Sequence, residues 1–211
     1  MSGDSPQILL HHGDLPAGLA LGARVAVDTE TTGLNPHRDK LCLVQLSAGN
    51  NVCHLVHFPP HLRDAYEAPN LKALLTDPQV CKLFHYARFD VTMLQRWLDI
   101  TCTPVYCTKI ASRLVRTYTD RHGLKDLCRE LLGIELSKEQ QSSDWGAESL
   151  SPEQLRYAAS DVLHLHRLRD KLDTMLSREG RLDLAHACFG FLPHRARLDL
   201  EGWAEEDIFA H

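Results

Sequence analysis

The first residues that could do chemistry are two acids at the end of an apolar segment. Asp28 and Glu30 lie in VAVDTETTGLNP, where a β-branched run typical of a strand gives way to the turn residues Thr, Gly, Asn and Pro. Side chains two apart in a strand point the same way, so both carboxylates can face one site. Acid pairs at this spacing are common, and without other motifs this one would read as a solvated edge pair.

A tyrosine and another acid lie four residues apart, Tyr157 and Asp161 in LRYAASDVLHLHRL. We predict a helical stretch from Ser151 to about Leu176, because Ser151 can cap it, Pro152 suits its first turn, and apolar residues recur with helical period. Positions i and i+4 share one helix face, so the phenol and the carboxylate can address one site. A half-buried tyrosine bonded to its helix neighbour has the same spacing.

A further acid, Asp90, lies early in a second predicted helix, 87–98, directly after the strand-like VCKLFH. Its place also suits an acid that merely favours the positive end of a helix dipole. Together the four carboxylates fit a nuclease site, in which two divalent cations about 3.5 to 4 Å apart clamp the attacking and leaving oxygens of a phosphodiester. The candidate catalytic residues are therefore Asp28, Glu30, Asp90, Tyr157 and Asp161.

The elements that would position these residues form an α/β pattern. RVAVD, LCLVQLS and NVCHLVHF read as three consecutive antiparallel strands joined by short turns. Strand and helix then alternate through PNLKALLTD, VCKLFH, ARFDVTMLQRWL and TPVYC to a helix near Lys109, and from Gly123 onward the chain is predicted to be almost wholly helical apart from a loop over 136–149. We expect one domain over 1–211, with a mixed central sheet flanked by helices and a helical C-terminal half.

Composition limits the partners. The formal net charge of −5 argues against a long basic track for extended or duplex RNA, although basic residues gather locally between Lys109 and Lys125. No apolar run approaches 18 residues, and MSGDSPQILLHHGD lacks the features of a signal peptide, so we expect a cytoplasmic protein with no membrane contact. The seven cysteines form no C-x-x-C pair and are expected to be reduced, mostly small core residues.

The order Asp-x-Glu, the Asp of an FD segment, and Tyr-x-x-x-Asp resembles the DEDDy branch of the ribonuclease D-like 3′–5′ exonucleases. The resemblance extends through KIASRLVRTYTDRHGLKDLCRELLG and LSKEQQSSDWGAESLSPEQLRYAASDV. It is closer still to the compact NrnC-type nano-RNases, in HHGDLP, DTETTGLNPHRDKLCLVQLS, QQSSDW and FLPHRARLDLEGWAEEDIFAH. This family has a ribonuclease H-like fold and hydrolyses RNA from the 3′ end.

The resemblance implies a role for each acid. Asp28 is expected to bridge two divalent ions, Mg²⁺ or Mn²⁺, with Glu30 and Asp161 completing the nucleophile-side ion and Asp90 holding the second. Tyr157 is expected to orient the attacking water, because a phenol with a pKa of about 10 is a poor base near neutrality. The expected substrates are very short single-stranded RNAs, especially diribonucleotides such as linear pGpG, and the products are nucleoside 5′-monophosphates.

Substrate contacts are expected on both sides of these acids. By resemblance, Leu34 wedges between two bases, with Thr29, Thr32 and Gly33 beside it. Stacking platforms are sought in His85, Phe89 and Trp145, and a cap for the 5′-phosphate in Ser143 or Arg113. Relatives often carry Asn where this chain has His85, which leaves the role of that position open. The same resemblance implies a homo-octamer, with 191–211 as a tail at a subunit interface.

Three other functions fit parts of the pattern. A compact ribonuclease D-like exonuclease would trim the 3′ ends of longer RNA or DNA. A catalytically silent nucleic-acid-binding or assembly module would keep the fold, although all five motif residues are present. A proofreading partner of a polymerase is a third alternative, to which no feature of the sequence points.

Overall fold

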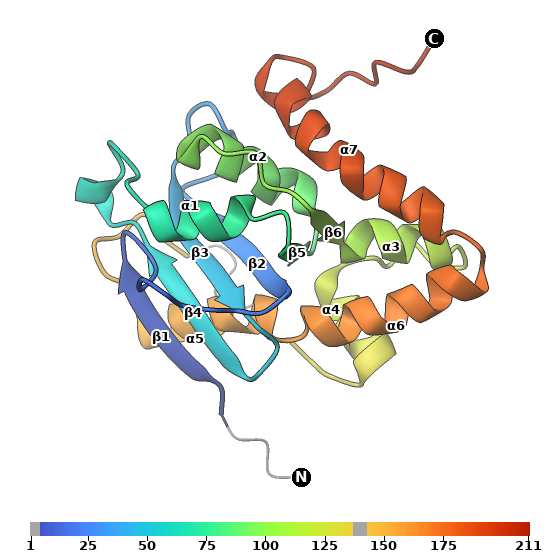
Figure 1. Ribbon diagram of the computed structural model, residues 1–211, viewed down its shortest axis with the longest axis horizontal. Helices are drawn as coiled ribbons and strands as arrows, with labels where there is room; N and C mark the ends of the chain where they lie inside the picture. Colours follow the sequence, from blue (N-terminus) through green and yellow to red (C-terminus); the bar gives the residue numbers. More distant parts are fainter. Residues whose placement is uncertain (1–4, 137–142) are drawn as a thin grey trace.

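The computed structural model describes residues 5–136 and 143–211. Within that part of the chain, six strands form one mixed sheet in the order β1-β4-β3-β2-β5-β6 (Figure 1). The strands are β1 (Gln7–His12), β2 (Arg24–Thr31), β3 (Leu41–Ser47), β4 (Val52–His57), β5 (Cys81–Phe84) and β6 (Val105–Cys107).

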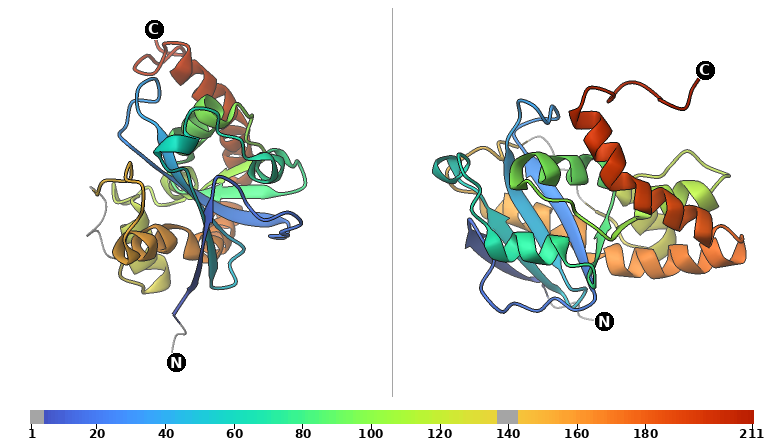
Figure 2. Two further views of the ribbon diagram at one scale, coloured as in Figure 1. Left: turned by 90° about the vertical axis from the view of Figure 1, so that its left-hand side faces the viewer. Right: turned by 45° about the horizontal axis from the view of Figure 1, so that its top comes forward.

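Helices cover both faces of the sheet, as Figures 1 and 2 show. Helices α1 (Pro69–Thr76) and α2 (Ala87–Leu98) lie on one face, and α5 (Pro152–Leu163) packs across β2, β3 and β4 on the other. The remaining elements are η1 (Pro60–Leu62), α3 (Thr108–Val115), α4 (Leu124–Leu127), the π-helical turn η2 (Cys128–Leu132), α6 (Leu165–Arg178) and α7 (Leu182–Leu200).

The three predicted antiparallel strands are confirmed. β2 pairs with β3, where Asp28 lies opposite Gln45, and β3 pairs with β4, both antiparallel. β5 and β6 continue the sheet from β2 as parallel strands, so the fold is the mixed sheet expected from the sequence. A register shift between Glu30 and Thr31 ends the regular pairing of β2, which turns the chain away from the sheet just after the two acids.

One strand was missed. β1, QILLHH, pairs parallel with β4 at the edge of the sheet, and its outer position leaves it partly exposed. Its sequence lacks an alternation of apolar and polar residues, so its assignment depends on the neighbouring strand and not on its own pattern. Parallel pairing with a later strand cannot be recognised in six residues.

The helical stretch after Ser151 begins as predicted. The Ser151 side chain accepts from the Gln154 backbone amide at 3.2 Å, and the Gln154 side chain accepts from the Ser151 amide at 2.9 Å, which completes a capping box. The stretch is two helices, because the chain departs from helical geometry at His164, where ψ is −5°. The break lets α5 follow the sheet and α6 pack on α3.

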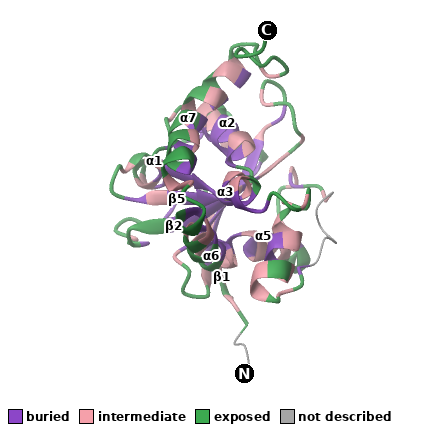
Figure 3. Ribbon diagram, turned by 90° about the vertical axis from the view of Figure 1, so that its right-hand side faces the viewer, coloured by how far each residue is buried: buried purple, intermediate pink, exposed green. Residues whose placement is uncertain are grey.

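The core runs between the sheet and both helix layers (Figure 3). Five of the cysteines are buried and two are half-buried, all without disulfides, as expected for small core residues. α7 lies along α2, and Leu192 and Ala196 are buried there, so the first part of 191–211 packs on its own chain. Among the described residues, no helix is both long and apolar enough to cross a membrane.

Candidate active site

Three of the predicted acids meet at the end of β2. Asp28 and Glu30 project from one face of that strand, and Asp161 comes from the α5 helix packed on the same face. One carboxylate oxygen from each lies within 4.8 Å of the others, and all three residues remain partly exposed. Residues 133 positions apart in the chain are thus brought to one solvent-accessible point.

Asp90 lies next to this group and is buried. Thr29, between the two β2 acids, donates from its hydroxyl to the Asp90 carboxylate at 2.7 Å. Tyr86 directly precedes α2, the helix that carries Asp90, and it adopts the left-handed backbone conformation with φ of 67°. That conformation is unfavourable for a tyrosine and is common at functional sites. The tight turn places Asp90 only six residues after β5 ends.

The pKa values of all four carboxylates are raised. Burial raises the pKa of Glu30 to about 9, with repulsion from Asp161 and Asp90 adding to the shift. Burial, followed by repulsion from the other three carboxylates, raises the pKa of Asp28 well above its ordinary range. Burial likewise raises the pKa of Asp161 and of Asp90 to about 7, although the hydrogen bond from Thr29 opposes the shift of Asp90.

These residues fit a divalent cation. Within residues 5–136 and 143–211, every charged group that perturbs Asp28 and Glu30 is a carboxylate, so this part of the chain supplies no balancing positive charge there. Carboxylate oxygens are the ligands that Mg²⁺ and Mn²⁺ prefer. Asp28, Glu30 and Asp161 form the close set and Asp90 stands beside it, whereas the division of ligands between two ions stays a prediction.

Tyr157 lies one helical turn before Asp161 on α5 and is half-buried. Its ring contacts that of Trp145, with centroids 6.1 Å apart. Burial raises the pKa of the Tyr157 phenol, and the charges of Asp161, Glu30 and Asp28 raise it further. The phenol therefore stays protonated near neutrality and suits the orientation of a water molecule better than proton abstraction.

The loop after β2 presents Leu34 to solvent. Leu34 is 81% exposed, the most exposed large apolar side chain in the described chain. Gly33 is required beneath it, because a Cβ there would lie 2.4 Å from an Asp39 carboxylate oxygen. The loop is held by Thr31, whose hydroxyl donates to the Gly33 carbonyl at 2.6 Å, and by Thr32, whose hydroxyl accepts from the Lys40 amide at 2.9 Å. An exposed leucine on a fastened loop is suited to contact a ligand.

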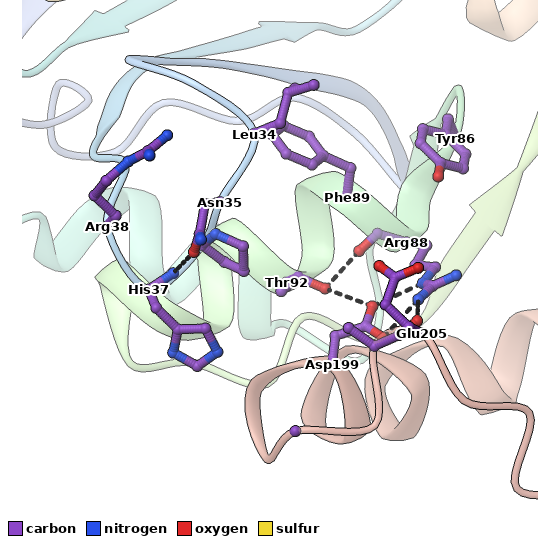
Figure 4. A pocket seen from close by; sticks show the side chains of 13 residues that line it. Leu34, Asn35, His37, Arg38, Tyr86, Arg88, Phe89, Thr92, Asp199 and Glu205 are labelled. Carbon is purple, nitrogen blue, oxygen red and sulfur yellow. Dashed lines mark hydrogen bonds and ion pairs between the residues drawn. The ribbon is translucent and has the colours of Figure 1, made fainter.

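A pocket of about 750 Å³ adjoins this loop. Leu34 and Phe89 line one side of it, and residues that follow α7, among them Glu205, line it elsewhere (Figure 4). Its volume is within the range of about 300 to 1,000 Å³ usual for small-molecule sites. The five candidate catalytic residues are not among those that line this pocket.

The other predicted substrate residues are more dispersed. His85 bonds through Nδ1 to the Thr108 hydroxyl at 2.9 Å, and burial lowers its pKa to about 3, so it is neutral and held in place. Trp145 is buried, which leaves little of its ring free to stack on a base. Ser143 accepts from Gln154 at 2.9 Å, and Arg113 is exposed in a separate pocket. Their substrate roles stay predictions.

The sequence analysis did not predict that residues after α7 line the pocket beside Leu34. Arg88 pairs with Asp199 at 2.7 Å, a contact between residues 111 positions apart. Arg88 and Asp199 lie in two of the segments quoted from the sequence, ARFDVTMLQRWL and FLPHRARLDLEGWAEEDIFAH, but nothing in either segment indicates that the two residues pair.

Comparison with known proteins defines the class. A family model described as 3′–5′ exonuclease matches residues 14–177, which include the four acids and Tyr157. The chain belongs to this family of 3′–5′ exonucleases. Ribonuclease D of Gluconacetobacter diazotrophicus is 35% identical over 159 residues, a match that covers 75% of this chain and 39% of that protein. The chain thus spans about two fifths of the length of this curated relative.

Solved structures narrow the similarity within the family. Brucella melitensis NrnC bound to pGG has a TM-score of 0.93 and 53% sequence identity, with 98% of this chain and 100% of that chain covered. Brucella melitensis NrnC with bound Mg²⁺ has a TM-score of 0.91 and 52% identity, with 97% and 99% covered. The likeness to NrnC therefore extends beyond the ribonuclease D match and includes α7.

Proposed function

We propose that this protein is a two-metal-ion 3′–5′ exoribonuclease that degrades very short RNAs, especially diribonucleotides such as linear pGpG, to nucleoside 5′-monophosphates. The single observation that carries the proposal is the close set of Asp28, Glu30 and Asp161, with Asp90 beside it. Membership of the 3′–5′ exonuclease family supports the direction of attack.

The four acids would hold the ions. By the family resemblance, Asp28 would contribute to both, Glu30 and Asp161 to the nucleophile-side ion, and Asp90 to the second. When bound, two such ions acidify the attacking water and stabilise charge on the leaving oxygen. Mg²⁺ or Mn²⁺ suits these oxygen ligands, and Brucella melitensis NrnC has been solved with Mg²⁺.

Tyr157 would orient the attacking water. The water oxygen forms a bond to the 3′-terminal phosphorus, the bond from phosphorus to O3′ breaks, and a proton passes to O3′. The products are a nucleoside 5′-monophosphate and an RNA shortened by one residue with a free 3′-hydroxyl. Because its phenol stays protonated, Tyr157 donates a hydrogen bond or fixes the water's position and does not take up the proton.

Two observations favour short RNA. The pocket has a volume of about 750 Å³, and the chain carries a formal net charge of −5, which gives an extended polyanion little overall electrostatic attraction. Brucella melitensis NrnC bound to pGG shows that a relative this similar takes a dinucleotide. Leu34 and Phe89, which line the pocket, would contact the bases.

The homo-octamer and the cytoplasmic location remain predictions from the sequence. The tail offers a surface for assembly, because Phe191, Trp203 and Phe209 are exposed, and the Phe191 and Phe209 rings lie 6.0 Å apart. Sedimentation of the purified protein would measure the assembly state.

The test is the release of mononucleotides from 5′-phosphorylated RNAs of two, seven and twenty residues with Mg²⁺ or Mn²⁺. We expect rapid cleavage of the dinucleotide, slow cleavage of the longer strands, and no cleavage by Asp28→Ala. An Asp170→Asn variant, altered at an exposed acid on α6, is the matched control and should retain wild-type rates.

Each outcome discriminates between functions. Equal or faster cleavage of the twenty-residue strand would favour the ribonuclease D-like alternative that trims longer 3′ ends. Binding without cleavage at any length would favour a silent binding module. Release of 3′-monophosphates or internal cleavage would contradict the proposal itself.

A further inference from the structure

Gln45 is a polar side chain inside a fully buried strand. All seven residues of β3 are buried, and the accessible surface of Gln45 is zero. The other polar residue of β3 is Ser47 at its end, and the Ser47 hydroxyl donates to the Val52 carbonyl at 2.7 Å. Burying an amide among apolar side chains costs free energy unless hydrogen bonds replace those lost from water. An apolar residue would fill the position of Gln45 at lower cost, so packing does not account for the amide.

The amide of Gln45 reaches the candidate metal ligand Asp28. The two residues lie directly opposite each other on the neighbouring strands β3 and β2 (Figure 1). Side chains directly opposite in an antiparallel pair project from the same face with their Cβ atoms about 5 Å apart. Gln45 Nε2 donates to Asp28 Oδ2 at 3.4 Å. Among the residues that the structure describes, no other side chain donates a hydrogen bond to this carboxylate.

The chemistry of the two groups sets the orientation of the amide. An ionised carboxylate only accepts hydrogen bonds, whereas a glutamine amide has two donors on its nitrogen and an acceptor on its oxygen. Turning the amide over would direct Gln45 Oε1 at Asp28 Oδ2, so that two acceptors would face each other. As placed, Oε1 is buried and has no hydrogen-bond partner among residues 5–136 and 143–211. Within those residues, the bond to Asp28 is therefore the one hydrogen bond that the amide makes.

A neutral donor suits a carboxylate that has to bind cations. Oxygens of Glu30 and Asp161 lie within 4.8 Å of an Asp28 oxygen, so the ionised groups repel one another. A lysine or arginine beside Asp28 would relieve this repulsion but would compete with a metal ion for the carboxylate. An amide N–H stabilises the charge of Asp28 without adding a cation, and it fixes the orientation of the carboxylate from a buried strand.

We infer that Gln45 is a positioning residue, whose amide N–H orients the Asp28 carboxylate for divalent-cation binding. The inference rests on the proposed function and gives a role to a residue outside the motifs that carry the acids. Groups that hydrogen-bond to a metal ligand typically contribute about 10- to 100-fold to metal affinity or activity. The bond from Gln45 is longer than the usual length of about 2.9 to 3.0 Å, so we expect an effect at the lower end of that range.

The experiment replaces the amide and keeps the packing. Gln45→Met removes the donor and leaves an unbranched side chain of similar length. Ser47→Ala is the matched control, because it removes a buried hydrogen bond from the same strand without touching a candidate ligand. Three quantities are measured on the full-length protein: Mn²⁺ affinity from the electron paramagnetic resonance of the free ion, kcat and KM for a 5′-phosphorylated diribonucleotide, and Tm in EDTA.

We expect Gln45→Met to weaken Mn²⁺ binding about tenfold and to lower kcat, with KM for the dinucleotide unchanged. Its Tm in EDTA should stay close to that of wild type, because the substitution removes an unpartnered carbonyl together with the bond to Asp28. Ser47→Ala should show the reverse pattern, a lower Tm with wild-type Mn²⁺ affinity. If Gln45→Met does not fold, Gln45→Leu is measured in its place.

Failure of the inference differs from failure of the proposed function. If the folded Gln45 variant keeps wild-type Mn²⁺ affinity, the positioning role is refuted. If Ser47→Ala weakens Mn²⁺ binding equally, general loosening of β3 replaces it. If wild type binds Mn²⁺ but cleaves no RNA, the proposed function fails, while the affinities still decide the role of Gln45.

Discussion

Neutralising Asp28 should stabilise the metal-free protein, an unusual effect for a residue at a candidate active site. Oxygen atoms of Asp28, Glu30 and Asp161 lie within 4.8 Å of one another. Two unit charges at that separation repel by about 3 kcal/mol at an effective dielectric constant of about 20. Proton uptake by Glu30, whose pKa is raised to about 9, relieves part of that repulsion at pH 8. We expect Asp28→Asn to add about 2 kcal/mol to the free energy of unfolding.

The assay is thermal unfolding in EDTA and in Mg²⁺. For a chain of 211 residues, about 2 kcal/mol corresponds to a rise in Tm of about 4 to 8 °C. Added Mg²⁺ should raise the Tm of wild type, by about 2.7 kcal/mol of stability at 100 times Kd, and should affect Asp28→Asn much less. The difference in Tm between Asp28→Asn and wild type should therefore become smaller or change sign when Mg²⁺ replaces EDTA.

Asp39→Asn is a control variant that should change Tm in the opposite direction to Asp28→Asn. Asp39 accepts from Arg38 at 2.7 Å and from the Asn35 amide at 2.9 Å, and these bonds hold the pKa of Asp39 below its ordinary value. Replacing Asp39 by Asn should therefore lower Tm. Asp28→Asn with a Tm in EDTA equal to or below that of wild type would refute the claim that the acids repel one another without a cation.

Four further predictions concern catalysis, proton release, the pH dependence of stability, and the fold. Tyr157→Phe should lose at least about 100-fold in kcat while Mn²⁺ affinity stays the same, and wild-type kcat would contradict the water-orienting role. Mg²⁺ binding at pH 7.5 should release protons, because the pKa of Glu30 is raised to about 9 and that of Asp161 to about 7. The buffer takes up these protons, so calorimetry in phosphate and in Tris should give different apparent binding enthalpies. These raised values also mean that metal-free stability should fall as pH rises from about 5 to 9, and a Tm that rises over that window would overturn the assignment. Arg116→Ala should cost about 2 to 4 kcal/mol, because Arg116 is fully buried and its loss removes hydrogen bonds to the Arg121 carbonyl and to the partly exposed Glu130. Arg156→Ala, in an exposed pair, should cost about 0 to 1 kcal/mol in the same urea titration.

Local sequence patterns predict much of this fold. The β2, β3 and β4 segments are apolar runs bounded by turn residues, and α5 carries its own capping box, so each is recognisable alone. The convergence of Asp28, Glu30 and Asp161 follows from strand and helix periodicity once the helix is placed on the sheet. β1 could not be found, because its strand character comes from its pairing with β4.

Long-range polar contacts account for the rest of what was missed. The Arg88–Asp199 pair joins residues with no shared motif, and the tail's role in lining the pocket depends on it. Arg116 illustrates the same limit, because it stands among the basic residues between Lys109 and Lys125, yet it is fully buried and bonds to the Arg121 carbonyl and the Glu130 carboxylate. Whether a charge lies on a surface or in a core depends on partners that the local sequence does not identify.

The most direct test of the metal site is an anomalous diffraction map from crystals grown with Mn²⁺. The account predicts manganese density between Asp28, Glu30 and Asp161, with a second peak toward Asp90, and loss of the peaks in Asp28→Asn crystals. An absence of manganese at these oxygens in wild-type crystals that hold it elsewhere, or an unchanged pair of peaks in Asp28→Asn, would contradict it.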